Sequence, residues 1–154
     1  MARMIFVNLR VSDLERAKKF YSSIGFVNEP RFTDDTAAGM TLSETIHVML
    51  LTPEKFRQFT HKAISDPFRA SSAIYAVTCE SRDAVDETLA RVADAGGTPD
   101  SNPPQDFGFM YSRSFEDPDG HDWELFWMDP VAAEKGPQEF NDLDGSYSGE
   151  EGVK

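Results

Sequence analysis

The stretch from Glu116 to Leu125 decides the fold of this 154-residue chain and reads Glu-Asp-Pro-Asp-Gly-His-Asp-Trp-Glu-Leu. Its first half predicts a tight turn, because Pro118 fixes φ at the first central position and Gly120 accepts the positive φ that closes the turn. The residues that follow, His121–Met128, are rich in strand formers. The sequence therefore predicts a sharp turn that leads directly into a strand.

The predicted strand places one carboxylate among aromatic side chains. Side chains alternate between the two faces of a strand, and this gives one face Trp123, Leu125 and Trp127 and the other face Asp122, Glu124 and Phe126. The first face predicts core. Glu124 is costly to bury without a partner or a metal, so it is either an ordinary exposed carboxylate or a group with a function.

The order of elements around this strand occurs twice along the chain. Ile5–Val11 and Ile74–Cys79 both alternate as strands do, and each runs into a segment with a helical apolar stripe. These segments predict helices over Asp13–Ile24 and Arg82–Ala95. Shorter strand candidates follow the helices, at 26–34, 38–43 and 45–52 in the first copy and at 109–115 and 122–128 in the second.

Polar residues at the start of each segment support the prediction of two helices. Ser12 and Glu15 fit a capping box, in which the hydroxyl and the carboxylate satisfy free N–H groups at the helix start. Ser81 fits the N-cap of the second helix. Gly25 and the pair Gly96-Gly97 then end the two helices.

These elements contain a set of residues that points to a known family: Val11–Ala17, Phe20-Tyr21, Gly25-Phe26, Asp117–Gly120 and Glu124-Leu125. In this order and spacing the chain resembles the vicinal-oxygen-chelate superfamily, also called the glyoxalase/bleomycin-resistance/extradiol-dioxygenase superfamily. The resemblance implies an α+β fold, with two βαβββ units that form a curved mixed sheet around a cleft. It does not imply a reaction, because a shared fold does not fix function.

The expected domain organisation follows from the repeat. Residues 1–130 are expected to form one vicinal-oxygen-chelate-like domain, with its units at 4–53 and 72–130 and a connector at 54–71. The two helices are expected to cover the convex side of the sheet. Residues 131–154 are rich in Gly, Ser and acidic residues, which is typical of a flexible tail.

The resemblance also implies where a metal would bind, on the first and last strands of each unit. The corresponding residues are Phe6, Met49, Ile74 and Glu124, and only Glu124 has a suitable donor. His47 shares a strand face with Met49 and is a second candidate. A catalytic divalent metal takes about three protein ligands, so no cofactor is expected, and a divalent metal held by Glu124 and His47 is the alternative.

The same alternation predicts the side chains that line the cleft. The candidate ligand-binding residues are Phe6, Asn8, Arg10, His47, Met49, Ile74, Tyr111, Arg113 and Phe126, and Glu124 is the candidate catalytic residue. A mainly apolar lining with a few polar groups is typical of a small-molecule pocket.

Composition limits the partners. The formal net charge of −12 argues against nucleic acid, whose binding needs clustered cations. No apolar run approaches the length of a membrane span, and none at the N-terminus resembles a signal peptide. Cys79 is the only cysteine, so no internal disulfide can form. We expect a cytoplasmic protein with a small-molecule ligand, and the resemblance implies a homodimer.

Two classes of function remain open at this point. The chain is either a binding protein that holds a small organic molecule in a cleft with a largely lost metal site, or a lyase, isomerase or dioxygenase-type enzyme. In the enzyme, Glu124 would act as a general base or a metal ligand. A purely structural Glu124, paired with Arg10 or Arg113, is the alternative to both.

Overall fold

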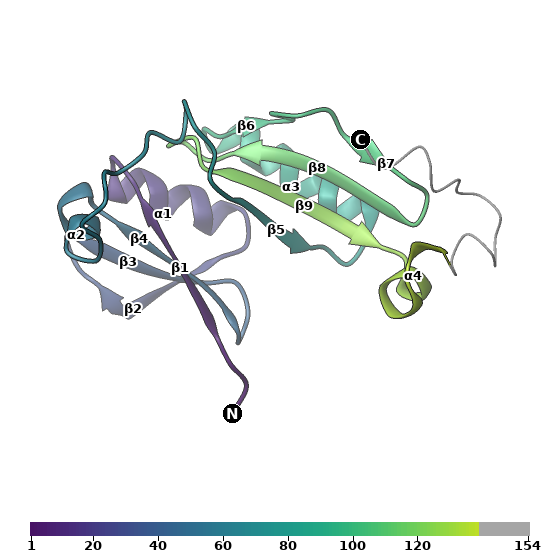
Figure 1. Ribbon diagram of the computed structural model, residues 1–154, viewed down its shortest axis with the longest axis horizontal. Coiled ribbons are helices and arrows are strands. Elements are labelled where there is room, and N and C mark those ends of the chain that lie inside the picture. Colours follow the sequence, from purple (N-terminus) through teal and green to yellow (C-terminus); the bar gives the residue numbers. More distant parts are fainter. Residues whose placement is uncertain (139–154) are drawn as a thin grey trace.

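The computed structural model describes residues 1–138, and two similar units lie side by side in it (Figure 1). The first unit contains β1 (Ile5–Arg10), α1 (Leu14–Ser23), β2 (Val27–Thr33), β3 (Ala37–Thr41) and β4 (Ile46–Leu51). The connector begins with α2 (Pro53–Arg57). The second unit contains β5 (Ile74–Thr78), α3 (Arg82–Asp94), β6 (Thr98–Pro99), β7 (Gln105–Asp106), β8 (Met110–Glu116) and β9 (Asp122–Met128), and is followed by α4 (Pro130–Lys135).

The α+β fold with two βαβββ units is confirmed, but the strands form two mixed sheets and not one continuous sheet. The strand orders are β1-β4-β3-β2 and β5-β9-β8-β6, with β7 paired to β8. The first strand of each unit runs parallel to the last, and the other pairs are antiparallel. β1 and β5 are therefore edge strands, and within residues 1–138 no strand pairing joins the two sheets.

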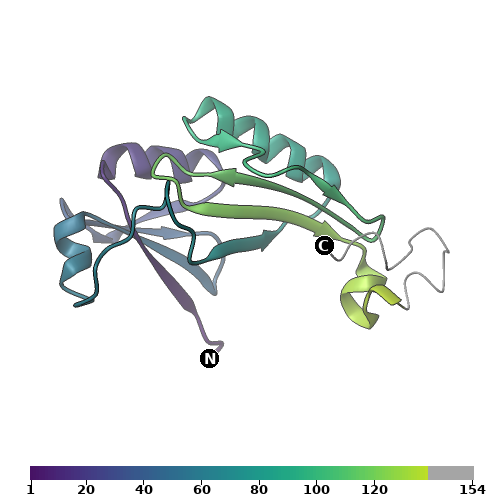
Figure 2. The ribbon, with the colours of Figure 1, turned by 45° about the horizontal axis from the view of Figure 1, so that its top comes forward.

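Both long helices cover the same side of the molecule. Figure 2 shows α1 and α3 above the strands, so that each sheet keeps one face without a helix. We call these two faces the open faces. One core cluster fills the helix side and takes residues from both units, such as Phe20 of α1, Val92 of α3 and Trp123 of β9. The two units thus share a single hydrophobic core.

The predicted helix starts are right in one case and wrong in the other. Ser81 is the N-cap of α3, and its hydroxyl accepts a hydrogen bond from Ala84 N at 3.0 Å. The N-cap of α1 is Asp13 and not Ser12. The amide and hydroxyl of Ser12 instead donate to Oδ1 of Asp119, at 2.9 and 2.7 Å. This long-range partner takes Ser12 away from the helix end.

The turn between β8 and β9 has the predicted form. Gly120 has φ of +90°, and its amide donates to the carbonyl of Asp117 at 3.0 Å. A Cβ at Gly120 would lie 2.7 Å from Cδ1 of Phe68 in the connector. Glycine is therefore required here both by the backbone conformation and by the close approach of an aromatic ring.

A buried carboxylate ties this turn to the other unit. Asp117 is 2% exposed, and its Oδ1 accepts hydrogen bonds from the amides of Asp119 and His121 at 3.0 and 2.8 Å. Its Oδ2 accepts one from the hydroxyl of Tyr21 in α1 at 2.6 Å, and Trp123 Nε1 donates to the same hydroxyl at 3.0 Å. Burial raises the pKa of the Asp117 carboxyl, and burial followed by the charge of Asp117 raises the pKa of Tyr21.

The described part of the C-terminal region contains one short helix. α4 begins at Pro130, the last residue of the predicted domain, and continues to Lys135 in the segment predicted as a flexible acidic tail. The remainder of that prediction, over 139–154, lies outside the described residues. Within residues 1–138, no helix has the length and apolar character needed to cross a membrane.

We predict that Tyr21→Phe lowers the free energy of unfolding by about 1–3 kcal/mol, because it removes a donor from a buried carboxylate. Tyr75→Phe is the matched control, since no hydrogen bond is assigned to its hydroxyl among residues 1–138, and it should change stability by less than about 0.5 kcal/mol. Urea denaturation of both variants measures the difference. Equal losses in the two variants would contradict this role of Tyr21.

Candidate functional site

The open face of the first sheet carries several of the predicted ligand-binding residues in rows. Strand register places Phe6 beside His47 and His47 beside Thr41. The next row contains Asn8, Met49 and Gly39. Side chains opposite each other in paired strands share a face. Phe6, Asn8, His47 and Met49 therefore lie together on this face, as predicted.

The open face of the second sheet carries the candidate carboxylate. Glu124 lies between Ala76 of β5 and Ser114 of β8, and Phe126 lies between Thr78 and Ser112. Asn8 pairs with Met49 in the first unit as Ala76 pairs with Glu124 in the second. Met49 and Glu124 are thus equivalent positions of the repeat.

Glu124 is half-buried, and its carboxylate has no hydrogen bond or ion pair with another residue of the described range 1–138. The structural alternative, in which Glu124 pairs with Arg10 or Arg113, is not formed. Arg113 is bound elsewhere, to Asp86 at 3.0 Å and Asp100 at 2.6 Å. A carboxylate on an open face without a partner is available to a ligand.

The prediction that Tyr111 and Arg113 reach the open face is wrong. They lie opposite Trp127 and Leu125, which puts them on the helix side. There the hydroxyl of Tyr111 donates to Asp86 of α3 at 2.6 Å. The turn motif in the sequence could have predicted this arrangement. If Asp117 pairs with His121 to close the turn, then Ser114 lies opposite Glu124. Ser112 and Ser114 of β8 then share the open face, and Tyr111 and Arg113 point to the helix side.

His47 faces the first open face, but its ring is already engaged. Nδ1 is 3.0 Å from the hydroxyl of Thr41, and Nε2 is 3.2 Å from the carbonyl of Glu44. A carbonyl can only accept, so Nε2 carries the proton and Nδ1 accepts from Thr41. The ring also stacks on Phe6 with 4.5 Å between centroids. His47 is thereby held as part of an aromatic pair.

The residues at the metal positions that the resemblance implies do not fit a catalytic divalent metal. Phe6 and Ile74 have no donor atom, and Met49 offers only a thioether, whereas hard divalent cations take oxygen and nitrogen ligands. His47 and Glu124 belong to different sheets. Within residues 1–138 no three or more His, Cys, Asp or Glu side chains converge on one point.

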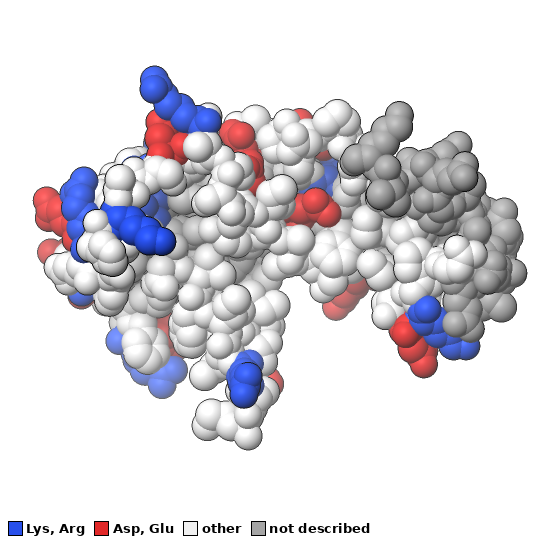
Figure 3. All heavy atoms as spheres, in the orientation of Figure 1, with Lys and Arg blue, Asp and Glu red and all other residues white. Residues whose placement is uncertain are grey.

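Apolar side chains stand exposed on the open faces. Phe6 is 48% exposed and Ile74 is 63% exposed. Figure 3 views these faces and shows mainly uncharged side chains across the middle of the molecule. The remaining predicted residue, Arg10, lies at the end of β1 and together with Asn8 lines a separate cavity beside the connector. The predicted set is therefore divided between two sheets and one cavity.

The chain belongs to the Glyoxalase/Bleomycin resistance protein/Dioxygenase superfamily, whose family model matches residues 3–125. This match covers the first unit, the connector and the second unit as far as Leu125 in β9. No curated protein sequence matches the chain.

Solved structures of the same fold support this assignment. A glyoxalase-related enzyme from Fulvimarina pelagi has a TM-score of 0.70 at 20% identity, with 85% of this chain and 91% of that chain covered. A hypothetical protein from S. aureus has a TM-score of 0.69 at 23% identity, with 82% and 95% covered. The fosfomycin resistance protein FosX from Mesorhizobium Loti has a TM-score of 0.58 at 19% identity, with 87% and 96% covered. At these identities the likeness shows a shared fold.

We predict that Arg113→Gln costs about 0.5–1 kcal/mol of stability at pH 7, because the ion pairs it removes are partly exposed. The pKa of Asp86 is lowered, first by the hydrogen bond from Tyr111 and then by Arg113. A lowered carboxyl pKa stabilises the fold above the unfolded value, and this contribution is lost as pH falls through the folded value. The cost of the variant should therefore shrink as pH falls to about 3.

Urea denaturation at the two pH values measures this cost. Arg57→Gln serves as the control, because Arg57 is an exposed cation with no ion pair among the described residues. A cost for Arg113→Gln that stays constant between the two pH values would show that the ion pairs with Asp86 and Asp100 do not stabilise the fold.

Proposed function

We propose that the protein binds a small, largely apolar organic molecule on its open faces, with Glu124 as the polar contact. The observation that carries the proposal is the state of Glu124, which is half-buried on an open face and has no partner within residues 1–138. Phe126 and Ile74 lie on the same face of the second sheet. Asp122 is on this face too, and apolar walls with these carboxylates suit a hydrophobic ligand that carries a cation.

A second copy of the chain is the proposed cover for the open faces. Val27, Phe32 and Ile74 are 68%, 61% and 63% exposed. Val27 lies in the same row as Thr41 and His47, so it extends the apolar surface that begins at Phe6. Extended apolar surfaces of this kind are typical of interaction sites. The negative net charge argues against nucleic acid and against an anionic surface as the partner.

Catalysis by the same residue is the second candidate function. A carboxylate that lies beside apolar side chains and has no partner can serve as a general base, provided that the substrate places its proton within hydrogen-bond reach. The free carboxylate of Glu124 favours this alternative, which would make the protein a lyase, an isomerase or an enzyme of dioxygenase type. Turnover of a bound ligand, monitored by mass spectrometry, distinguishes an enzyme from a binding protein.

We predict that Glu124→Gln weakens binding of an amine ligand by about tenfold, because it removes one charge-assisted hydrogen bond. The probes are phenethylamine and phenylethanol, which differ only in the charged group. Wild-type protein should prefer the amine, and the variant should bind the two equally. Glu87→Gln, on the exposed surface of α3, is the matched control and should keep the preference.

Calorimetric titration and a thermal melt of each variant complete this test. Unchanged affinity for the amine together with a clear loss of melting temperature in Glu124→Gln would show that the residue is structural. The same loss of preference in both variants would show that the effect comes from net charge alone.

We predict that the protein in solution has twice the mass of the 17.2 kDa chain. Ile74→Asp should shift it toward the monomer, because a carboxylate on an apolar interface has no partner and must be desolvated. Sedimentation at micromolar concentration measures both. A wild-type mass of 17.2 kDa would reject the proposed assembly.

A further inference from the structure

An irregular segment interrupts the strand edge beside Glu124. The amide of Asp100, just after β6, donates to the carbonyl of Ser114 at 2.8 Å, and Gln105 in β7 pairs with Ser112. Between these two points the chain advances five residues where β8 advances two. The extra residues form a bulge at the edge of the second sheet. We call residues 101–104 the edge bulge.

The edge bulge folds onto the open face next to Glu124. Ser114 lies opposite Glu124 in the register of β8 and β9, and side chains in such pairs have Cβ atoms about 5 Å apart. The hydroxyl of Ser114 accepts from the amide of Asn102 at 2.8 Å and donates to the carbonyl of Asn102 at 3.2 Å. The hydroxyl of Ser101 also donates to it, at 3.3 Å. The edge bulge therefore rests on the nearest neighbour of Glu124.

The start of the edge bulge is held in a strained conformation. Asp100 has φ of +50° and is the only residue other than glycine with a positive φ among residues 1–138. Arg113 donates to both of its carboxylate oxygens, from Nε at 3.0 Å and from Nη2 at 2.6 Å. Strain of this kind persists where the surroundings fix it, and it is concentrated at functional sites. Pro103 and Pro104 restrict φ in the rest of the bulge.

The first unit has a bulge at the equivalent place. There β2 advances four residues where β3 advances one. A Cβ at Gly39 would lie 3.1 Å from Cβ of Phe32, so this bulge also folds onto its open face. Gly39 lies opposite Met49 as Ser114 lies opposite Glu124. A bulge beside the central position of the open face is thus a feature of the repeat, aromatic in the first unit and polar in the second.

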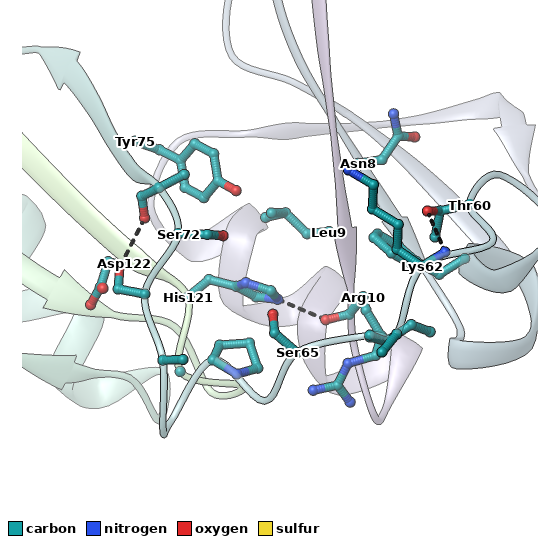
Figure 4. Close-up of a pocket in the computed structure, with 18 residues that line it drawn as sticks. Asn8, Leu9, Arg10, Thr60, Lys62, Ser65, Ser72, Tyr75, His121 and Asp122 are labelled. Carbon is teal, nitrogen blue, oxygen red and sulfur yellow. Dashed lines mark hydrogen bonds between the residues drawn. The ribbon is translucent and has the colours of Figure 1, made fainter.

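The other side of Glu124 is open. Residues 74, 76 and 78 of β5 share the open face and are exposed, whereas Ser112 is buried and Ser114 half-buried on β8. Along β9 the face continues to Asp122, which lines the cavity beside the connector (Figure 4). A ligand at Glu124 therefore has room over β5 and meets a wall at β8.

We infer that the edge bulge limits the size of the cationic group that Glu124 accepts, and that Asp100 is the positioning residue that holds the bulge in place. The inference rests on the function proposed above, in which Glu124 binds the cation of an apolar ligand. An unsubstituted ammonium group fits beside the bulge, and a branched substituent on the nitrogen overfills the space, which rigid packing does not tolerate. The ligand class is a primary amine whose apolar body extends over β5.

Calorimetric titration of the full chain with three probes tests the wall. Phenethylamine and N-isopropylphenethylamine are both cations at neutral pH and both keep N–H donors, but they differ in the size of the cationic group. Wild-type protein should bind the primary amine about tenfold more tightly. Phenylethanol, which has no charge, reports separately whether the cation is recognised.

Two variants release the edge bulge in different ways. Asp100→Asn removes the ion pair with Arg113 and adds no strain, because asparagine tolerates a positive φ. Ser114→Ala removes the hydrogen bonds beneath the bulge. Each should reduce the preference for the primary amine to about twofold or less and keep the preference for phenethylamine over phenylethanol.

Two further variants serve as controls. Ser114→Thr keeps the hydroxyl and should keep the wild-type preference for the primary amine. Glu29→Gln removes the ion pair with Arg31 at the bulge of the first unit and should also leave this preference unchanged. Hydrogen exchange without ligand tests the positioning role directly, since the amide of Asn102 should exchange about tenfold faster in Asp100→Asn than in wild type or Glu29→Gln.

The outcomes separate this inference from the proposed function. Equal binding of the two amines by wild type, with phenethylamine still preferred over phenylethanol, would overturn the wall and leave the proposed function standing. Wild-type selectivity in both bulge variants, or unchanged exchange of Asn102 in Asp100→Asn, would overturn the roles of the bulge and of Asp100. Equal binding of phenethylamine and phenylethanol by wild type would reject the proposed function and this inference with it. Melting temperatures within a few degrees of wild type show that a change in selectivity comes from the bulge.

Discussion

The hydrogen bond from Tyr21 to Asp117 is the interaction on which the arrangement of the two units depends. It joins residues 96 positions apart, one in the first helix and the other in the last turn. The same carboxylate accepts two amide hydrogen bonds inside that turn, so one side chain both shapes the turn and receives the helix. A buried carboxylate is costly, as the raised pKa of Asp117 shows, and several donors are needed to hold it there.

The position of the open faces follows from this contact. With the turn fixed against α1, the aromatic side of β9 packs under the helices, and Trp123 lies 5.8 Å from Tyr21 between ring centroids. The opposite side of β9, which carries Glu124, must then face away from the core. The same turn sets the register of β8 against β9 and so places Ser114 beside Glu124. The core and the candidate site are thus two consequences of one turn.

The sequence predicted features that depend on neighbouring residues and missed those that depend on distant ones. The turn, the alternation along β9 and the cap at Ser81 each follow from local patterns, and the structure has all three. Ser12 was misassigned because its partner Asp119 lies 107 positions away. The faces of Tyr111 and Arg113 were misassigned because alternation alone does not say which residue of one strand lies opposite which residue of the next. The cavity beside the connector, which Asn8 and Arg10 line, depends on the path of an irregular segment for which no periodic pattern exists.

The two units keep the same framework but not the same chemistry. The pair Asn8 and Met49 in the first unit is equivalent to the pair Ala76 and Glu124 in the second. The strand register is therefore the same in both units. At the equivalent central position one unit carries an apolar thioether and the other a carboxylate. A ligand shared by both faces would therefore meet an apolar wall on one side and a charge on the other, and such a difference selects the orientation of an amphipathic molecule. The repeat supplies the scaffold, and its departures from symmetry give the two open faces different chemistry.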